Sequence, residues 1–310
     1  MSAGARGSTV TSRPAPSSEC FVYITLPGQV SAVTAGRFAV TKEPRGDPIG
    51  QFVYRAKYLD DAQAVEIDPI ELRRARPGRT LGRKFNRPDD RWNNTRVECA
   101  MLRLARECGI TAAESRIESA GGKDVLLVKR FDREKGPIGY TRARMVSGLT
   151  ILRSDEAAES RQNWSYVNLV EELRRIVEDA KKDAKELFRR MCFNALISNI
   201  DDHPRNHAII TNERNWKLSP AYDLTPSVPV SMERRDLALD CGDMGRYANA
   251  KNIISQHARF LLDRDEAEKI VNGLKAQVEA TWYGTVRSSG VSEKDAETIR
   301  GAFVYPGFSL

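Results

Sequence analysis

The spacing of apolar residues changes along this chain, from strand-like alternation in its first part to a three-and-four repeat in its second. We expect strands at 21–26, 37–40 and 51–54, because these runs are rich in β-branched and aromatic residues. In the second half the apolar residues follow helical stripes, at 166–177 and 184–196. Strands gathered in one block and helices in another predict an α+β fold with two lobes.

Shorter patterns complete this outline. Asn93 or Asn94 can cap a helix that Gly109 ends, because its apolar residues recur at helical spacing between them. Further strands, a hairpin and helices are predicted on either side of that helix and in the second half. These are a strand at 82–85, strands at 114–118 and 125–129, a hairpin joining 208–210 to 216–218, and helices near 265–283 and 292–302.

Composition narrows the class of protein. The chain has 310 residues and 41% hydrophobic residues, which is enough for a large core. Lys and Arg exceed Asp and Glu by 49 to 42, and this net charge of +7 favours polyanionic partners such as nucleotides or nucleic acid. The five cysteines form no C-x-x-C pair, so a reducing cytoplasm is expected. No apolar stretch is long enough to span a membrane.

One polar segment carries most of the chemical information. Asp201 is followed by Asn206, and Asp223 stands further along the chain. Phosphoryl transfer uses one carboxylate as the base for the attacking hydroxyl, and an Asn with a second Asp to hold magnesium. The D-x4-N spacing is that of a kinase catalytic loop, and Asp223 is where the metal-binding Asp should come. Taken singly, each of these residues could merely satisfy the amides of a turn.

A second pair of residues could serve the same reaction. Lys84 lies at the end of a short predicted strand, and Glu98 lies early in the following helix. A kinase uses a strand Lys to hold the α- and β-phosphates and a helix Glu to hold that Lys. A surface salt bridge, or no contact at all, would explain the same two residues.

The two histidines of the polar segment allow another reading. His203 and His207 have the spacing of a helical zinc pair, which would make Asp201, His203 and His207 part of a metal-dependent hydrolase. Pro204 argues against a regular helix through this point, and no further Cys or His cluster completes a site.

Several of these segments together resemble the HipA family of bacterial serine/threonine kinases, which act as toxins of type II toxin–antitoxin systems. The resemblance covers 82–310 well and 20–68 weakly. It is carried by the loop at 201–206, the segment at 219–223, the Arg-Phe-Asp-Arg run at 130–133 and the helix at 97–110.

The resemblance implies a two-lobed protein-kinase-like fold, with a small antiparallel-sheet N-terminal part and a helical C-terminal lobe. The corresponding segments are a disordered tail at 1–18, a small N-terminal β subdomain at 19–68, a shortened linker at 69–81, a kinase N-lobe remnant at 82–160, and a helical C-lobe with the catalytic loop at 161–310.

The resemblance also implies roles for individual residues, with ATP and Mg2+ as cofactors. Asp201 would be the general base towards a Ser or Thr hydroxyl of a protein substrate, and Asn206 and Asp223 would hold the metal. The remaining residues would surround the nucleotide: Lys84 at its phosphates with Glu98 orienting it, Lys129, Arg130 and Phe131 bordering the adenine, and His203 and Tyr222 against the nucleotide. The family's targets belong to the translation machinery, and its usual partner is a helix-turn-helix antitoxin that links the complex to DNA.

One departure from the family leaves a second function open. The family's Gly-rich phosphate-covering loop, which also carries its regulatory autophosphorylation serine, has no clear counterpart; the Ala-Arg-Pro-Gly run at 75–78 is at most a remnant. Without backbone amides over the phosphates, nucleotide affinity and alignment should suffer. The alternative to an active kinase is therefore a catalytically weak or dead pseudokinase that acts as a binding protein with an antitoxin and DNA.

Overall fold

The chain folds into two compact units, and each is described by itself. The computed structural model describes residues 19–25, 30–41, 49–60, 81–84, 91–120, 123–136, 139–155, 157–212, 214–228 and 231–309. The first unit comprises 1–89 and 137–139, and the second comprises 90–136 and 140–310. The predicted tail at 1–18 and nearly all of the predicted linker at 69–81 lie outside the described residues, and the predicted domain boundaries stay predictions.

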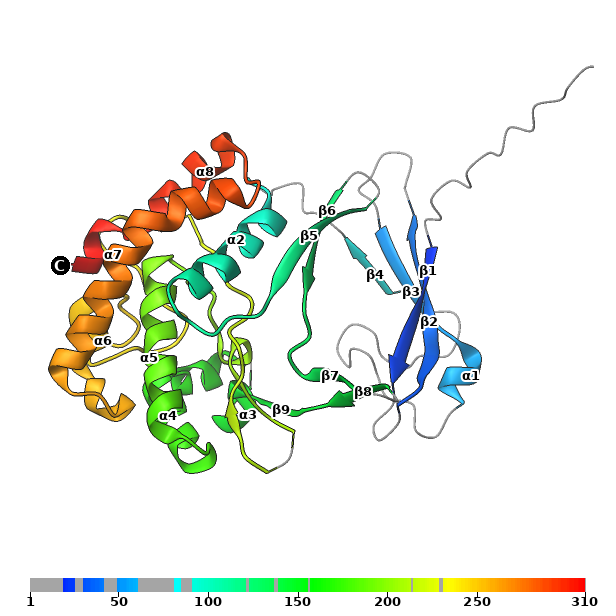
Figure 1. The fold of residues 1–310 in the computed structure, drawn as a ribbon, viewed down its shortest axis with the longest axis horizontal. Helices are drawn as coiled ribbons and strands as arrows, with labels where there is room; N and C mark the ends of the chain where they lie inside the picture. Colours follow the sequence, from blue (N-terminus) through cyan, green and yellow to red (C-terminus); the bar gives the residue numbers. More distant parts are fainter. Residues whose placement is uncertain are drawn as a thin grey trace, which may run out of the picture. The chain divides into compact units, whose positions relative to one another are not determined.

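The first unit is a four-stranded antiparallel sheet in the order β1-β2-β3-β4 (Figure 1). Along β3, Phe52 and Tyr54 are buried whereas Val53 between them is exposed, as the two-residue period of a strand requires. Phe52 and Tyr54 pack with Ala35 and Tyr58 in a small core. The elements are β1 (Glu19–Thr25), β2 (Ala32–Thr41), β3 (Ile49–Tyr54), α1 (Ala56–Leu59) and β4 (Leu81–Lys84).

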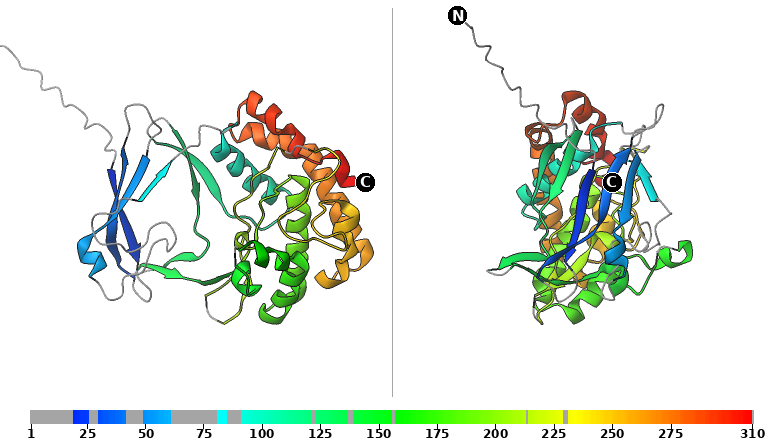
Figure 2. Two further views of the ribbon diagram at one scale, coloured as in Figure 1. Left: turned by 180° about the vertical axis from the view of Figure 1, so that it is seen from behind. Right: turned by 90° about the vertical axis from the view of Figure 1, so that its right-hand side faces the viewer.

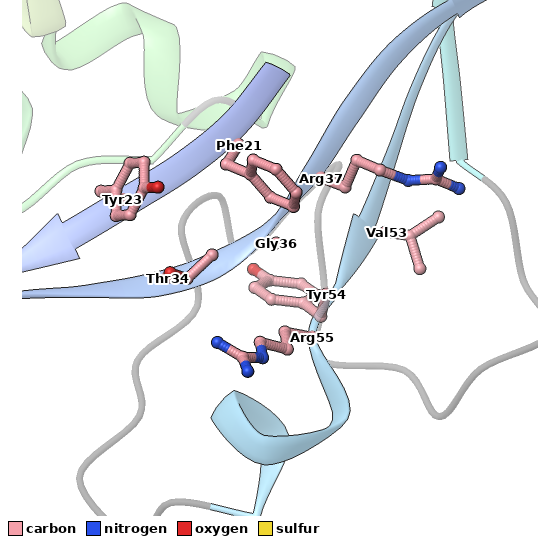
Figure 3. A pocket seen from close by; sticks show the side chains of 8 residues that line it. All are labelled: Phe21, Tyr23, Thr34, Gly36, Arg37, Val53, Tyr54 and Arg55. Carbon is pink, nitrogen blue, oxygen red and sulfur yellow. The ribbon is translucent and has the colours of Figure 1, made fainter. Parts of the chain in front are cut away.

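A hollow of about 520 Å³ opens on this sheet (Figure 3). Gly36 is needed beside it, because a Cβ there would lie 2.4 Å from the ring of Phe52 and from the carbonyl oxygen of Val53. None of the residues predicted for the functional site lines this hollow. Its lining consists of Phe21, Tyr23, Thr34, Gly36, Arg37, Val53, Tyr54 and Arg55.

The second unit contains three small sheets. The first two are pairs, β5 with β6, which run antiparallel, and β7 with β8, and in the third β10 lies between β9 and β11. The strands are β5 (Ser115–Ala120), β6 (Lys123–Val128), β7 (Arg133–Gly136), β8 (Gly139–Arg142, whose first residue is counted with the first unit), β9 (Arg144–Ser147), β10 (Ala208–Thr211) and β11 (Lys217–Leu218).

Helices contain far more of the second unit than strands do (Figures 1 and 2). Helix α5 packs against α4 and α7, and α2 packs against α7. The α-helices are α2 (Asn94–Glu107), α3 (Gly148–Ile151), α4 (Tyr166–Ile176), α5 (Ala180–Leu196), α6 (Ala250–Ser255), α7 (Arg264–Ser288) and α8 (Glu293–Ile299). Short 3-10 segments are η1 (Ala158–Asn163), η2 (Pro204–Asn206), η3 (His257–Phe260), η4 (Arg300–Ala302) and η5 (Pro306–Ser309).

Polar side chains fix where these helices begin. Asn93 accepts a hydrogen bond from the amide of Arg96 at the start of α2, and Asp263 forms a capping box with Glu266 at the start of α7. Each α-helix then turns an apolar face to a shared core, which includes Leu104, Phe188 and Val278 among many others. No helix among the described residues is long and apolar enough to cross a membrane.

The structure confirms the α+β fold class and most of the predicted elements. Strands occur in each predicted stretch, and the helix predicted between Asn93 and Gly109 is α2. The helix predicted near 292–302 is divided into α8 and η4. The pair of strands β7 and β8, and β9 after them, were not predicted; they cover 133–147, where Gly and Arg residues interrupt any alternation.

Candidate functional site

Helix α5 delivers the loop that carries Asp201. The helix ends at Leu196, and Ser198 then adopts a left-handed backbone conformation with φ of 54°, which turns the chain away from the helix axis. The hydroxyl of Ser198 donates to the carbonyl of Ala302, and Arg235 donates to the same hydroxyl. These bonds fasten the start of the loop to the C-terminal part of the chain.

The two neighbouring carboxylates of the loop face opposite ways. Asp201 is exposed, whereas Asp202 is almost fully buried. Asp202 accepts hydrogen bonds from the hydroxyl of Tyr166 and from Nε2 of His207, the latter at 2.8 Å. The side chain of Asn194 donates to the same Tyr166 hydroxyl at 3.1 Å. Buried polar groups that satisfy one another hold the backbone in one conformation, so Asp202 anchors the loop that presents Asp201.

Asn206 and Asp223 meet beside this anchor. Asn206 is buried, and its side chain lies close enough to the carboxylate of Asp223 to lower the pKa of that group. Asp223 has a left-handed φ of 57°, and the hydroxyl of the preceding Tyr222 donates to the carbonyl of Arg205 at 2.6 Å. The bond from Tyr222 thus ties the segment at 222–223 to the loop.

The electrostatics of Asp223 show how closely the acidic groups gather. Asp223 keeps contact with solvent, but loss of surrounding water is the main reason why its pKa is raised. The negative charges of Asp201 and Asp202 raise this pKa further, whereas His203 and the side chain of Asn206 lower it. Asp201, His203, Asn206 and Asp223 therefore lie in one neighbourhood.

Glu98 belongs to the same neighbourhood. It lies on α2, is half-buried, and has its pKa raised to about 7 by burial and, secondly, by the charge of Asp223. Lys84, its predicted partner, lies on β4 of the first unit, and its side chain lies outside the described part of the structure. The Lys84–Glu98 pair stays a prediction.

The segment predicted to border the adenine follows β6. The ring of Phe131 lies 5.6 Å from that of Tyr222, which brings these two predicted nucleotide neighbours together. Lys129 pairs with Glu114 at 3.0 Å on the surface. Arg130 forms two hydrogen bonds with Asp132, at 2.7 and 2.6 Å.

A divalent cation would suit the group around Asp223. The carboxylate of Asp223 and the side-chain oxygen of Asn206 are the hard ligands that magnesium prefers. Positive charge there would also relieve the crowding of Asp201 and Asp202 that raises the pKa of Asp223. The residues present therefore fit magnesium.

The zinc alternative finds no support in the described residues. His207 is buried against Asp202, and the ring of His203 instead lies 6.5 Å from that of Trp164. Within the described ranges, no three His, Cys, Asp or Glu side chains are grouped so as to hold a metal ion.

Two hollows lie near these residues in the second unit. One, of about 10 Å³, lies beneath the loop beside Asn206 and Tyr222, and it is large enough for about one water molecule. The other, of about 610 Å³, is lined by Phe131, Pro220 and charged residues of α5, such as Lys182. Neither hollow is lined by Asp201 or Asp223.

Sequence comparison identifies the family. A family model described as the HipA-like C-terminal domain matches residues 63–282, which is most of the chain. This chain belongs to the HipA-like family.

Several relatives of the HipA-like chain bear the name of kinases. It is 28% identical to the "Putative kinase Y4mE" of Sinorhizobium fredii over 138 residues, 43% of this chain and 33% of that protein. It is 26% identical over 178 residues to a "Putative kinase" of Haemophilus influenzae, covering 54% of this chain and 52% of that protein. The chain thus matches about half or less of the length of these curated relatives.

A solved structure shows the same fold. The HipA-like chain matches HipA of Shewanella oneidensis, which was solved in a toxin–antitoxin complex with HipB and operator DNA. The TM-score is 0.56 at 17% identity, and the match covers 73% of this chain and 59% of that chain. The predicted kinase-like α+β fold is therefore confirmed.

Sequence reasoning did not single out Asp202, Tyr166 or Asn194. The paired Asp-Asp at 201–202 was the available signal, because it offers two carboxylates where one predicted role needs only one. Tyr166 and Asn194 lie on α4 and α5 within apolar stripes, where nothing in the sequence distinguishes them from ordinary core positions.

Proposed function

We propose that this protein is a HipA-like serine/threonine kinase that transfers the γ-phosphoryl group of ATP to a Ser or Thr hydroxyl of another protein. The observation that carries the proposal is that Asn206 and the exposed carboxylate of Asp201 both lie close enough to Asp223 to shift its pKa. These are the three side chains that the reaction needs together.

Each side chain has its own role in the proposed reaction. Asp201 accepts the proton of the attacking hydroxyl, and its exposure supports access by a protein substrate. Asn206 and Asp223 hold magnesium, which when bound neutralises charge on the β- and γ-phosphates. Asp202 keeps Asp201 in place through its bonds to Tyr166 and His207.

The nucleotide contacts are proposed on less direct grounds. The pairing of the Phe131 and Tyr222 rings supports an apolar border for the adenine, with Lys129 and Arg130 on either side of Phe131 in the sequence. The half-buried Glu98 with its raised pKa is suited to accept a cationic partner such as Lys84. His203 lies close enough to Asp223 to lower its pKa, which supports a place for His203 against the nucleotide.

Phosphoryl transfer can be tested directly with labelled ATP, magnesium and a cell extract that contains aminoacyl-tRNA synthetases. We expect label to enter a protein with the wild-type chain but not with Asp201→Asn. The matched control is Asp265→Asn, an exposed position on α7, which should label as the wild type does. Equal labelling by Asp201→Asn and the wild type would remove Asp201 from the mechanism.

A pseudokinase that acts only by binding is the second candidate. It is favoured by the absence of a clear Gly-rich loop in the sequence. The melting temperature with ATP and magnesium shows whether the chain binds nucleotide, because a ligand that binds only the folded state raises it. Combined with the labelling assay, it separates the pseudokinase from the kinase. A shift without protein labelling supports the pseudokinase, and a shift with labelling supports the kinase.

The proposed partners follow from the family. We infer a translation protein as substrate, a helix-turn-helix antitoxin as partner, and indirect attachment to DNA through that antitoxin, all within the cytoplasm. The complex of the Shewanella HipA with HipB and DNA supports the antitoxin, and the net charge of +7 supports a nearby polyanion. Co-purification with the product of a neighbouring gene would test the partnership.

A further inference from the structure

Three arginines gather around a single carboxylate in the segment after β6 and in the β7–β8 pair. Arg130 forms two hydrogen bonds with Asp132, and Nε of Arg133 lies 3.5 Å from the same carboxylate. Arg142, at the end of β8, belongs to this group because Arg130, Arg133 and Asp132 all influence its pKa. The amide of Ala143 donates to the carbonyl of Asp132 at 2.9 Å, which fixes the end of β8 beside it. We call these four side chains the arginine cluster.

Two guanidinium groups of the cluster are incompletely paired. Nε of Arg133 and both Nε and Nη2 of Arg142 are buried, and none of them has a hydrogen-bond partner in the described part of the chain. Buried donors are nearly always satisfied in folded proteins, because leaving one unpaired costs free energy. Arg142 thus has donors that the described residues do not use.

The charges of the cluster also favour the binding of an anion. Three cations surround one carboxylate, and Arg130 already occupies both oxygens of that carboxylate. The pKa of Arg142 is lowered by burial, then by repulsion from Arg133 and Arg130, and the attraction of Asp132 offsets this only in part. An additional anion would remove the repulsion and supply the missing acceptors.

Solvent can reach the cluster. The side chain of Arg130 is 65% exposed and that of Arg133 is 27% exposed, so a small ion can approach without unfolding β7 or β8. Phe131 lies between Arg130 and Asp132 in the sequence, and its ring packs on Tyr222, next to Asp223. The cluster therefore adjoins the segment that we propose for nucleotide binding.

We propose that the arginine cluster is a binding site for a phosphate group, held chiefly by Arg142 and Arg133 with Arg130 at its open side. A guanidinium group presents paired N–H donors that match the oxygens of a phosphate, and charge-assisted bonds of this kind are strong. The phosphate comes either from free inorganic phosphate or from a nucleotide, and in the second case Arg130 contacts the phosphate in place of the adenine. The site stands on its own geometry and does not require the chain to be an active kinase.

The first arm of the test uses inorganic phosphate. We expect phosphate to raise the melting temperature of the wild-type chain in the presence of saturating ATP and magnesium, compared with potassium chloride at equal ionic strength. Arg142→Gln should lose this rise. Lys181→Gln removes the same charge from an exposed position on α5 and should keep it. This pattern assigns the site to free phosphate.

The second arm compares ATP with adenosine by calorimetry. If the cluster holds a phosphate of the nucleotide, Arg142→Gln weakens ATP binding about tenfold or more and leaves adenosine binding unchanged, because only a charge-assisted contact is lost. In that case added inorganic phosphate has no effect once ATP is saturating. Either pattern supports the phosphate site and identifies its source.

Folding of the variant provides an independent check. Because two nitrogens of Arg142 are buried without a partner and its charge is repelled, Arg142→Gln should be at least as stable as the wild type in phosphate-free buffer. The proposal is overturned if Arg142→Gln and Lys181→Gln respond alike to both phosphate and ATP. If the wild type binds phosphate but not ATP, the proposed kinase function fails and the phosphate site remains.

Discussion

The side chain of Asn206 lies beside the carboxylate of Asp223 and lowers its pKa, which brings the end of the loop at 201–206 to the segment after β11. The same pair is suited to bind one cation, because amide and carboxylate oxygens are both hard ligands. The two side chains already lie together, so binding requires only that the amide oxygen of Asn206 turn toward the cation. Preorganised ligands lose less conformational freedom when the cation arrives.

Replacing Asn206 should therefore affect binding through the metal. We expect Asn206→Ala to weaken magnesium-dependent ATP binding about tenfold or more, because groups that hold or orient a metal typically contribute at least this much. Binding of ATP in the presence of a chelator should change little. Calorimetry with and without magnesium measures both quantities, and Asn163→Ala, at an exposed position in η1, serves as the control. Equal losses with and without magnesium would contradict a metal-holding role.

Glu98 should make stability depend on pH. Its pKa rises from an ordinary 4.5 to about 7 through burial and the charge of Asp223. Between these two values the folded protein keeps a proton that the unfolded chain has released, so the free energy of unfolding falls as pH rises through this window. Above the window the charged form is fully present and the loss is complete.

Glu98→Gln should remove this part of the pH dependence, because glutamine stays neutral. In urea titrations without nucleotide or metal, we expect the variant to match the wild type at pH 4.5 and to exceed it in stability at pH 8. Glu159→Gln, an exposed position in η1, should follow the wild-type profile. A constant difference between Glu98→Gln and the wild type at both pH values would count against a raised pKa.

The sequence predicted those parts of the fold that rest on local periodicity. The apolar stripe at 184–196 lies within α5, and the capping signals at Asn93 and Gly109 bound α2 as expected. Both helices bury one face in the core, so their positions follow from the repeat alone. The position of the loop at 201–206 could also be predicted, because the loop comes directly after α5. The roles of Asp201 and Asn206 remain predictions.

Features that depend on distant parts of the chain could not be predicted. The choice between Asp201 and Asp202 as the exposed carboxylate depends on Tyr166, which lies on another helix. The arginine cluster joins Arg142 to Asp132 through two short strands that have no alternating pattern. Such contacts are set by tertiary packing, which a single sequence does not reveal.

Tyr166 should contribute measurably to stability through its hydroxyl. It is fully buried, donates to Asp202 and accepts from Asn194, and burial keeps it neutral by raising its pKa. Tyr166→Phe leaves both partners with one bond fewer, which should cost about 1–3 kcal/mol in the free energy of unfolding. Tyr247→Phe is the control, because that hydroxyl donates to the carbonyl of Glu233 at the surface. If chemical denaturation shows that Tyr166→Phe and Tyr247→Phe lose the same small free energy of unfolding, the cooperative buried network is contradicted.

Two glycines should respond in opposite ways to the same substitution. Gly273 lies inside α7 with nothing within 4 Å of an added Cβ, whereas a Cβ on Gly242 would lie 1.9 Å from the backbone oxygen of Asn252. Gly273→Ala should raise the free energy of unfolding by about 0.5–1 kcal/mol, because alanine restricts the unfolded chain and favours a helix.

Gly242→Ala should lower the free energy of unfolding by about 1–3 kcal/mol, because relieving the overlap must displace backbone. The backbone concerned is held in place, since the buried side chain of Asn252 donates to the carbonyls of Gly245 and Tyr247. Urea denaturation of both variants measures whether each substitution raises or lowers the free energy of unfolding. A stabilised Gly242→Ala would show that the chain at 242 does not approach α6 as closely as this structure has it.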